Sequence, residues 1–265
     1  MKKKASCRPG AFVLALLLAA ACSPKPPGAG PNSLSTAEMK QGWALLFNGR
    51  SLKGWHGSGF KNVPAGRWAV EDGTIVTLPA AGEQGRKTAG FDLVSDETFA
   101  DFELSFEWKV GPGGNSGLKY NVSDEITRRF GPGLSGRGGA VGFEYQLLDD
   151  ALNPDARVGP HRKAGSLYDI VPVAAGSARP AGAFNASRIV FCGERGEHWL
   201  NGVKVLEYGL GSPELRARLA ASKFRDIPGF AQKRKGPIVL QYHGDRVVFR
   251  AIKVRRLEPA FPPAA

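Results

Sequence analysis

Strict alternation of apolar and polar residues marks the clearest element of the chain. Between residues 101 and 110, large apolar side chains occupy every second position and mostly charged side chains stand between them. A period of two with the apolar residues on one side predicts a β-strand with one buried face. Shorter runs of similar character predict further strands at 68–70, 74–78, 117–122, 142–148, 188–192, 198–200, 238–243 and 247–255.

Turn sequences separate these runs, and one helix is predicted between two late strands. Asp72-Gly73 and Asn201-Gly202 are residue pairs that tight hairpins favour. Ser212 suits a helix N-cap and Pro213 suits the first turn of the helix. Many strands, one short inserted helix and no strand–helix alternation predict an all-β fold of two packed sheets.

Polar side chains are predicted to gather on one face of a sheet. Three predicted strands carry such pairs, namely Lys119 with Asn121, Glu144 with Gln146, and Gln241 with His243, while His198 lies opposite Trp199 in a fourth. A solvent-exposed sheet is also polar on one side. Glu, Gln, His and Asn, however, are not the Lys, Thr and Ser of a plain exposed face. Because amides and carboxylates pair with sugar hydroxyls, the pattern favours a carbohydrate site on a concave sheet, bordered by the loop at Asn115.

The first 21 residues have the features of a signal peptide. A lysine-rich start precedes an apolar run at 11–21 that is too short to span a bilayer. The run ends in small residues before Cys22, as in bacterial lipoproteins, whose cysteine is acylated. Leu18 stands one position too far from Cys22 for the usual pattern, so ordinary signal-peptidase cleavage is the alternative. We expect an exported lipoprotein anchored to a bacterial membrane, facing the periplasm or the cell exterior.

The chain is predicted to hold a single folded domain. A Pro/Gly-rich tether at 22–40 follows the signal peptide of 1–21, the domain spans 41–258, and 259–265 form a tail. The net charge of +12 falls to +8 once the basic residues of 1–21 are removed. An exported protein seldom meets nucleic acid, so the excess predicts a solvated basic face. Cys192, alone in an apolar run, is predicted to be a core thiol.

Known hydrolase motifs are missing from the sequence. It contains no G-x-S-x-G elbow, no H-E-x-x-H zinc helix and no phosphate-binding glycine loop. The paired acidic motif of sandwich-fold β-glucanases is missing as well. The sequence therefore does not indicate a conventional two-carboxylate glycosidase.

Eight segments, in the same order, resemble the 3-keto-disaccharide hydrolase family. They include GWALLFNG at 42–49, GGNSG at 113–117, FEYQLLD at 143–149, EHWLNG at 197–202 and LQYHG at 240–244. The resemblance covers about residues 41–257 and implies a concanavalin-like jelly-roll sandwich that acts on sugars oxidised at C3. Two positions depart from the family pattern, because Tyr242 replaces a frequent Asp and Ala251 a frequent Asn.

The resemblance also implies a mechanism. A ketone at C3 acidifies the C2 proton, so a base can remove it, the C1 substituent leaves by β-elimination, and water adds to the enone. Glu144 is the predicted base, with His198 or His243 as the acid for the leaving oxygen. The predicted substrate-binding residues, which include donors to the enolate oxygen, are Asn115, Lys119, Gln146, Asp149, Tyr168 and Gln241.

Several alternatives stay open at this stage. No cofactor or metal ligand is predicted, but a divalent ion on Glu144 and the histidines is an alternative way to stabilise the enolate. A non-catalytic carbohydrate-binding protein is the competing class, since lectins share the sandwich. An adhesin held by the basic face is a third class. The expected partners are an oxidised oligosaccharide or glycoside and, through the lipid alone, a membrane. The sequence defines neither the sugar and linkage nor the oligomeric state.

Overall fold

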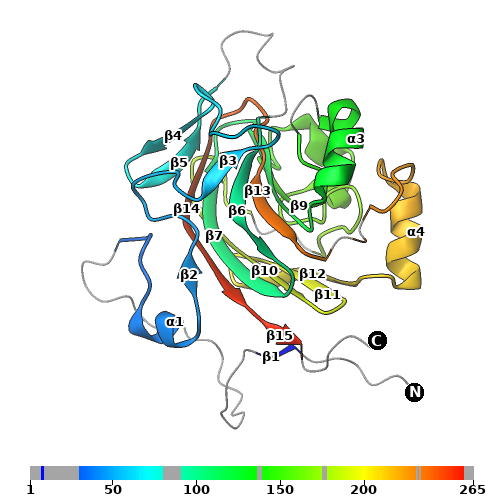
Figure 1. Ribbon diagram of the computed structural model, residues 1–265. Coiled ribbons are helices and arrows are strands. Elements are labelled where there is room, and N and C mark those ends of the chain that lie inside the picture. Colours follow the sequence, from blue (N-terminus) through cyan, green and yellow to red (C-terminus); the bar gives the residue numbers. More distant parts are fainter. Residues whose placement is uncertain are drawn as a thin grey trace.

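Two antiparallel β-sheets packed face to face make up the body of the protein (Figure 1). The computed structural model describes residues 7–8, 30–79, 91–135, 139–174, 178–230, 232 and 234–259. Cys22 and most of the predicted signal peptide lie outside these residues. Within the described part of the chain, no helix is long and apolar enough to cross a membrane.

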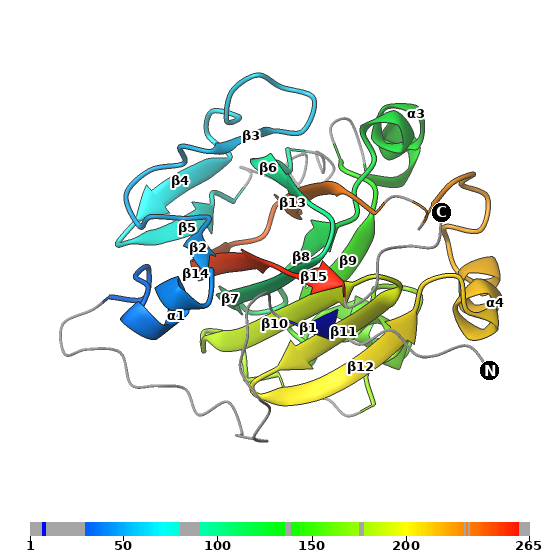
Figure 2. The ribbon, with the colours of Figure 1, turned by 60° about the horizontal axis from the view of Figure 1, so that its bottom comes forward.

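The larger sheet has eight strands. Its hydrogen-bonded order is β12 (Val203–Gly209), β11 (Arg195–Leu200), β10 (Asn185–Cys192), β7 (Phe102–Val110), β14 (Val247–Arg256), β5 (Thr74–Thr77) and β4 (Trp68–Glu71), and β2 (Ala44–Leu45) also pairs with β14. The smaller sheet has the order β3 (Trp55–Gly57), β6 (Leu93–Phe99), β13 (Gly236–Leu240), β8 (Asn115–Tyr120) and β9 (Phe143–Leu148). Figure 2 shows β10, β11 and β12 side by side at one end of the sandwich. The prediction of an all-β jelly-roll sandwich is confirmed.

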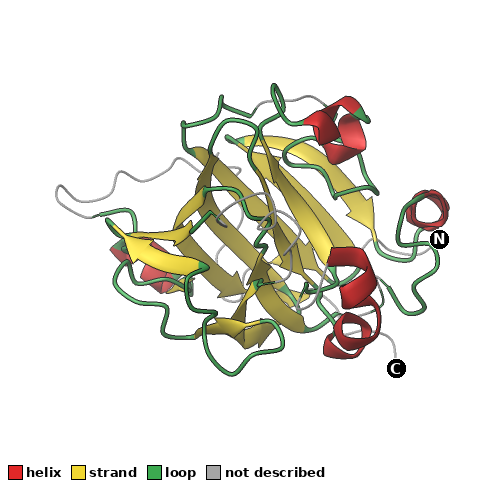
Figure 3. Ribbon diagram, turned by 90° about the horizontal axis from the view of Figure 1, so that it is seen from above, coloured by secondary structure: helices red, strands yellow, loops and turns green. Residues whose placement is uncertain are grey.

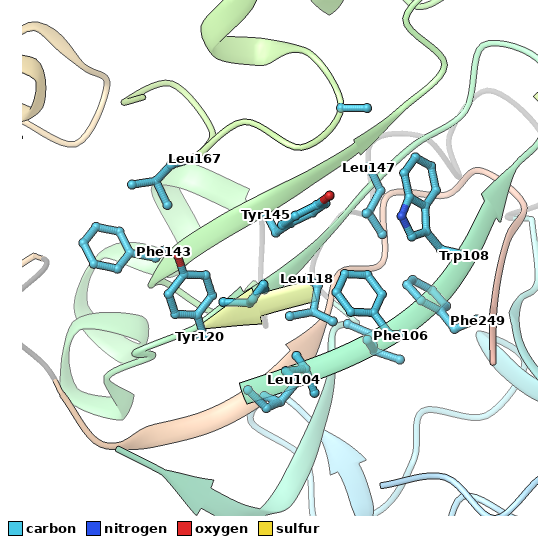
Figure 4. Packing of buried hydrophobic residues seen from close by; sticks show 14 of the residues in the cluster. Leu104, Phe106, Trp108, Leu118, Tyr120, Phe143, Tyr145, Leu147, Leu167 and Phe249 are labelled. Atoms are coloured by element: carbon cyan, nitrogen blue, oxygen red, sulfur yellow. The ribbon is translucent and has the colours of Figure 1, made fainter. Parts of the chain in front are cut away.

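Alternation along the strands directs large side chains into the space between the sheets. Leu104, Phe106 and Trp108 of β7 are buried, as are their counterparts on β8 and β9 (Figure 4). The rings of Phe106 and Tyr145 meet edge to face across the core, with their centroids 5.5 Å apart. Because Tyr145 points inward, its neighbours on β9 point to the outer face of the five-stranded sheet.

Helices lie at the margins of the sheets (Figure 3). α4 (Pro213–Ala221) begins where the sequence predicts, and the Ser212 hydroxyl accepts a hydrogen bond from the Leu215 amide. Two further helices were not predicted, α1 (Thr36–Lys40) and α3 (Asp124–Ser135). The glycines around Pro132 in α3 are residues that disfavour a helix. Two single-turn 3₁₀ helices, η1 (Pro154–Arg157) and η2 (Pro160–Arg162), follow β9.

The segment before the domain also contacts the larger sheet. The Asn32 side chain accepts a hydrogen bond from the Ala251 amide at 2.9 Å and donates one to the Gly73 carbonyl at 2.6 Å. Ala251 has a positive φ of 52° at an irregularity of β14, a conformation that favours Asn over Ala. The side-chain amide of Asn32 thus binds the backbone at Ala251 and at Gly73.

Cys192 is buried and disulfide-bonded, so the prediction of a lone core thiol is wrong. The chain has only two other cysteines, Cys7 and Cys22. Cys7 forms β1 (Cys7–Arg8), which pairs with β15 (Glu258–Pro259).

Candidate functional site

Glu144 lies on the outer face of the five-stranded sheet with only 7% of its surface exposed. Its Oε2 atom is 3.4 Å from the side-chain nitrogen of Gln241. The Gln146 amide, oriented so that its nitrogen faces acceptors, donates to Glu144 Oε1 at 3.2 Å and to the Ser116 carbonyl at 2.9 Å. Two amides therefore hold the carboxylate in place.

Gly117 on the neighbouring strand makes room for this carboxylate. A Cβ atom at Gly117 would lie 2.4 Å from Glu144 Oε1, far inside van der Waals contact. Gly117 has no positive φ in this structure, so the close approach of Glu144, and not the backbone conformation, requires glycine here.

Lys119 pairs across the sheet with Glu144 but binds a different carboxylate. Its ammonium is 2.9 Å from Asp92 Oδ2 and donates to the Ala140 carbonyl at 2.9 Å, and Lys119 and Asp92 are only 2% and 1% exposed. Burial lowers the pKa of Lys119, but Asp92 and Glu144 outweigh burial and leave the pKa raised. Lys119 is thus a charged member of an internal ion pair, and its predicted contact with substrate stays untested.

Asp92 binds several groups in the layer under the Glu144 side chain. This role was not predicted from the sequence. Besides Lys119, it accepts hydrogen bonds from the backbone amides of Ala140 and Tyr242, both at 2.9 Å. A single aspartate at the start of a strand carries no motif, so its role is visible only in three dimensions.

Burial raises the pKa of Glu144 above its ordinary value of 4.5. The charges of Lys119, Lys223 and His243 oppose this shift, and the charge of Asp92 adds to it, but burial prevails. A carboxylate whose pKa moves towards neutrality is a better general base than an exposed one.

Tyr168 connects Glu144 to a network of ion pairs. Its backbone amide donates to the Glu144 carbonyl at 2.9 Å, and its hydroxyl donates to Asp155 Oδ2 at 2.9 Å. Arg162 joins Asp155 to Asp169 through two hydrogen bonds of 2.8 Å. Burial, helped by the charges of Glu144 and Asp155, raises the pKa of Tyr168 well above its ordinary value, so the phenol stays protonated.

Lys223 lies near the candidate site and was not among the residues that the sequence predicted there. Its backbone amide donates to Asp169 Oδ2 at 2.7 Å, and its ammonium lies 4.4 Å from the centroid of the Tyr168 ring. The residue as a whole is exposed, yet the protein around its ammonium displaces water and thereby lowers its pKa. Its position depends on the loop after α4, which gives no signal in the sequence.

His243, Gln241 and Asn115 gather beside Glu144 as predicted. The charge of His243 acts on Glu144, and the His243 side chain is 42% exposed. Its Nδ1 atom is 3.9 Å from Asp245 Oδ2, which also accepts a hydrogen bond from the Asn115 backbone amide at 3.1 Å. The Asn115 side chain lies 3.4 Å from the amide of Gln146. Together with Glu144, these residues form the outer surface that we call the Glu144 face.

His198 does not belong to the Glu144 face, so the prediction of a shared site is wrong. It is 0% exposed, and its two ring nitrogens lie 2.8 Å from the Tyr120 hydroxyl and 2.9 Å from the Gly165 carbonyl. Its ring packs 4.6 Å from that of Tyr145, which points inward from β9 while Glu144 points outward. Burial lowers the pKa of His198 to about 4.

Asp149 and Tyr242 also have structural roles. The buried Asp149 carboxylate accepts hydrogen bonds from the backbone amides of Gly113, at 2.8 Å, and Ala151, at 3.1 Å. It therefore shapes the loop that carries Asn115, and the structure does not support the predicted substrate contact. The Tyr242 side chain is buried and donates to the Leu78 carbonyl at 2.9 Å, so it points away from the Glu144 face.

The Glu144 face is separate from a cavity beside α4. A cavity of about 590 Å³ lies beside α4, with Leu215, Phe224 and Phe230 among its lining residues, and no residue of the Glu144 face lines it. Among the residues that the structure describes, no group of three or more His, Cys, Asp or Glu side chains is arranged to hold a metal ion. The candidate site is therefore identified by the polar side chains around Glu144, and neither by this cavity nor by a set of metal ligands.

Comparison with known proteins relates this chain to enzymes that act on glycosides. The profile of the 3-keto-alpha-glucoside-1,2-lyase-like domain matches residues 42–255. A protein from Bacteroides thetaiotaomicron named 3-keto-disaccharide hydrolase is 34% identical over 254 residues, which cover 85% of each chain. The fold and these matches define a glycoside-acting enzyme. The chain belongs to the 3-keto-alpha-glucoside-1,2-lyase-like family.

Solved structures share the architecture. A candidate glycosyl hydrolase from Parabacteroides distasonis is 29% identical with a TM-score of 0.72, and the match covers 86% of this chain and 99% of that one. A second candidate glycosyl hydrolase from the same organism shares the fold with a TM-score of 0.61 at 23% identity, over 81% of this chain and 98% of that one.

Proposed function

We propose that the protein cleaves 3-keto-glycosides, including 3-keto-disaccharides, by deprotonation at C2, β-elimination at C1 and hydration of the enone. Family membership and the name of the Bacteroides relative support the substrate class. The observation that carries the mechanism is the burial of Glu144, a carboxylate with a raised pKa on a polar outer face.

Glu144 is the base in this scheme. Its carboxylate takes the C2 proton, and the electrons of that bond form a C2–C3 double bond while the C3 oxygen becomes an enolate. The amides of Gln146 and Gln241 fix the carboxylate, so little reorganisation is needed when the proton moves. A base with a raised pKa also holds the abstracted proton more firmly.

His243 is the candidate acid for the departing oxygen. It is the half-exposed imidazole of the Glu144 face, whereas His198 is enclosed in the core. When the enolate re-forms the ketone, the C1–O bond breaks and the leaving oxygen takes a proton. Water then adds to the enone, so the net change is hydrolysis of the glycoside.

The competing function is carbohydrate binding without chemistry, since a sandwich fold by itself does not define an activity. The test is to incubate the protein with a 3-keto-disaccharide and, separately, with its unoxidised parent, and to follow both by mass spectrometry. We expect cleavage of the keto sugar alone. Binding of the keto sugar without turnover would favour the binding protein, and equal cleavage of both sugars would indicate ordinary glycosidase chemistry.

A further inference from the structure

The proposed chemistry places negative charge on the C3 oxygen, and a cation beside that oxygen would stabilise it. Lys119 has the right neighbour in Glu144 but is enclosed. Its ammonium is bound to Asp92 and to the Ala140 carbonyl, and the residue is only 2% exposed. A sugar at the surface of the sheet cannot reach it without breaking a buried ion pair.

Lys223 is placed differently. Its ammonium lies over the ring of Tyr168, whose backbone amide is bonded to the carbonyl of Glu144. Tyr168 thus connects the Lys223 ammonium to the strand that carries Glu144, and the charges of Lys223 and Glu144 act on each other. In the described part of the chain, Lys223 forms no ion pair with a carboxylate within 4 Å, which leaves its N–H donors available to a ligand.

The backbone at Lys223 is held in place although its side chain extends from a loop. Asp169 accepts the Lys223 amide at 2.7 Å, and Arg162 ties Asp169 to Asp155, which in turn accepts the hydroxyl of Tyr168. Asp169 has a positive φ of 61°, a conformation that aspartate adopts at a cost. This network holds the Lys223 backbone and the Tyr168 ring that its ammonium contacts.

We propose that Lys223 is a catalytic residue whose ammonium binds the C3 carbonyl oxygen of the substrate and stabilises the enolate formed when Glu144 removes the C2 proton. This inference rests on the proposed function. The lysine stays protonated throughout and forms no bond to carbon. The proton goes from C2 to Glu144, and the electron pair goes into the C2–C3 double bond while the C3 oxygen gains the charge.

The position and charge of Lys223 make the contact between its ammonium and the enolate oxygen strong. Protein around the Lys223 ammonium displaces water, and a charge–charge contact in such surroundings is worth more than in bulk solvent. The lowered pKa of Lys223 has the same cause, and a nearby enolate would raise it again. The ammonium therefore gains more from the enolate than from the neutral ketone, which is what catalysis of this step requires.

The test isolates enolisation from departure of the leaving group. A 3-keto-1,5-anhydrohexitol has no glycosidic oxygen at C1 and keeps only the ring oxygen there, so exchange of its C2 proton in heavy water can be followed without loss of an aglycone. We expect the wild-type protein to exchange C2–H, Lys223→Met and Lys223→Gln to be slower by about 10²-fold, and Lys223→Arg to stay within about tenfold of wild type. Lys235→Met, an exposed lysine of the same loop, is the matched control and should exchange at the wild-type rate.

The outcomes separate this inference from the proposed function. A wild-type protein that neither exchanges C2–H nor cleaves a 3-keto-disaccharide overturns the proposed function. A wild-type protein that exchanges, a Glu144→Gln variant that does not, and Lys223 variants with the wild-type rate overturn the role of Lys223 alone. Borohydride reduction in the presence of the ketone, followed by mass spectrometry, checks the chemistry. A substrate adduct on Lys223 would show an imine in place of the ammonium contact.

Discussion

Glu144 lies so close to Gly117 that a methyl group there would come within 2.4 Å of the Glu144 Oε1 atom. The carboxylate of one strand thus occupies the place of a missing side chain on the next. This packing buries Glu144 on a face of the sheet that would otherwise be exposed to solvent. Burial is the main cause of the raised pKa of Glu144.

Replacing Gly117 with alanine tests this packing. Gly117→Ala should displace the Glu144 carboxylate, lower kcat/KM by tenfold or more, and lower the free energy of unfolding by about 1–3 kcal/mol, the usual cost of overpacking. Steady-state kinetics and urea unfolding measure the two effects. Gly111→Ala is the control, because its nearest neighbour would be 3.7 Å away. Unchanged kinetics in Gly117→Ala would mean that the position of Glu144 is not critical.

Removing the charge of Glu144 should abolish most activity without unfolding the protein. Glu144→Gln keeps the shape and should lower kcat by about 10²-fold or more, the usual contribution of a general base. Glu97→Gln is the matched control, since Glu97 lies on the same sheet with an exposed side chain. Glu103 would be a poor control, because it is buried and paired with Arg188 and Arg255. A wild-type kcat in Glu144→Gln would remove the base from the scheme.

The same variant should also change how stability depends on pH. Because its folded-state pKa is raised, Glu144 binds a proton more tightly in the folded than in the unfolded protein. The free energy of unfolding therefore falls as pH rises from about 4.5 through the raised pKa. As pH rises over this range, the stability of Glu144→Gln in thermal unfolding should increase relative to that of the wild type. A constant difference between the two proteins at all pH values would contradict the raised pKa.

The strands were predictable and the pairing of buried charges was not. β7 and β9 alternate large apolar with polar residues, so the outward direction of Glu144 and Gln146 followed from their own sequence. Asp92 and Lys119 are 27 residues apart, and no local pattern reports such a contact. Lys223 depends in the same way on the fold of a loop.

His198 shows a different limit of sequence reasoning. Alternation in β11 separates His198 from Trp199 correctly but does not tell which of the two faces the core. The larger and more apolar Trp199 was expected inside. In the structure, Trp199 is partly exposed under the Arg188 guanidinium, at 3.9 Å, while His198 is enclosed by hydrogen-bond partners.

Breaking the buried pair beneath the site should cost stability. Asp92→Asn leaves the Lys119 ammonium buried without a counter-charge, for which we expect a loss of about 3–5 kcal/mol in the free energy of unfolding. The double variant Asp92→Asn/Lys119→Met should recover part of this loss, because the unpaired charge is gone. Urea unfolding of the two single variants and the double variant measures the coupling. Additive losses would show that the pair has no net interaction.

His198 should matter for stability and not for the chemical step. His198→Phe removes the hydrogen bonds to Tyr120 and Gly165 and should lower the free energy of unfolding by about 1–3 kcal/mol. The pKa of about 4 keeps His198 neutral in the folded protein, so wild-type stability is lost as pH falls from about 6.5 towards 4, a loss that the variant should lack. The folded variant should keep kcat near the wild-type value. A 10²-fold loss of kcat at full folding would restore His198 as a catalytic candidate.

Breakage of the C2–H bond is the central claim, and isotope incorporation measures it most directly. A 3-keto-disaccharide is cleaved by the protein in heavy water, the reaction is stopped before completion, and mass spectrometry with NMR locates deuterium in the product and in the recovered substrate. A buffer control without protein corrects for spontaneous exchange. The account predicts deuterium at C2 in the wild-type reaction, and incorporation above the buffer control that is slower by about 10²-fold or more with Glu144→Gln. Cleavage by the wild type with hydrogen fully retained at C2 would contradict it.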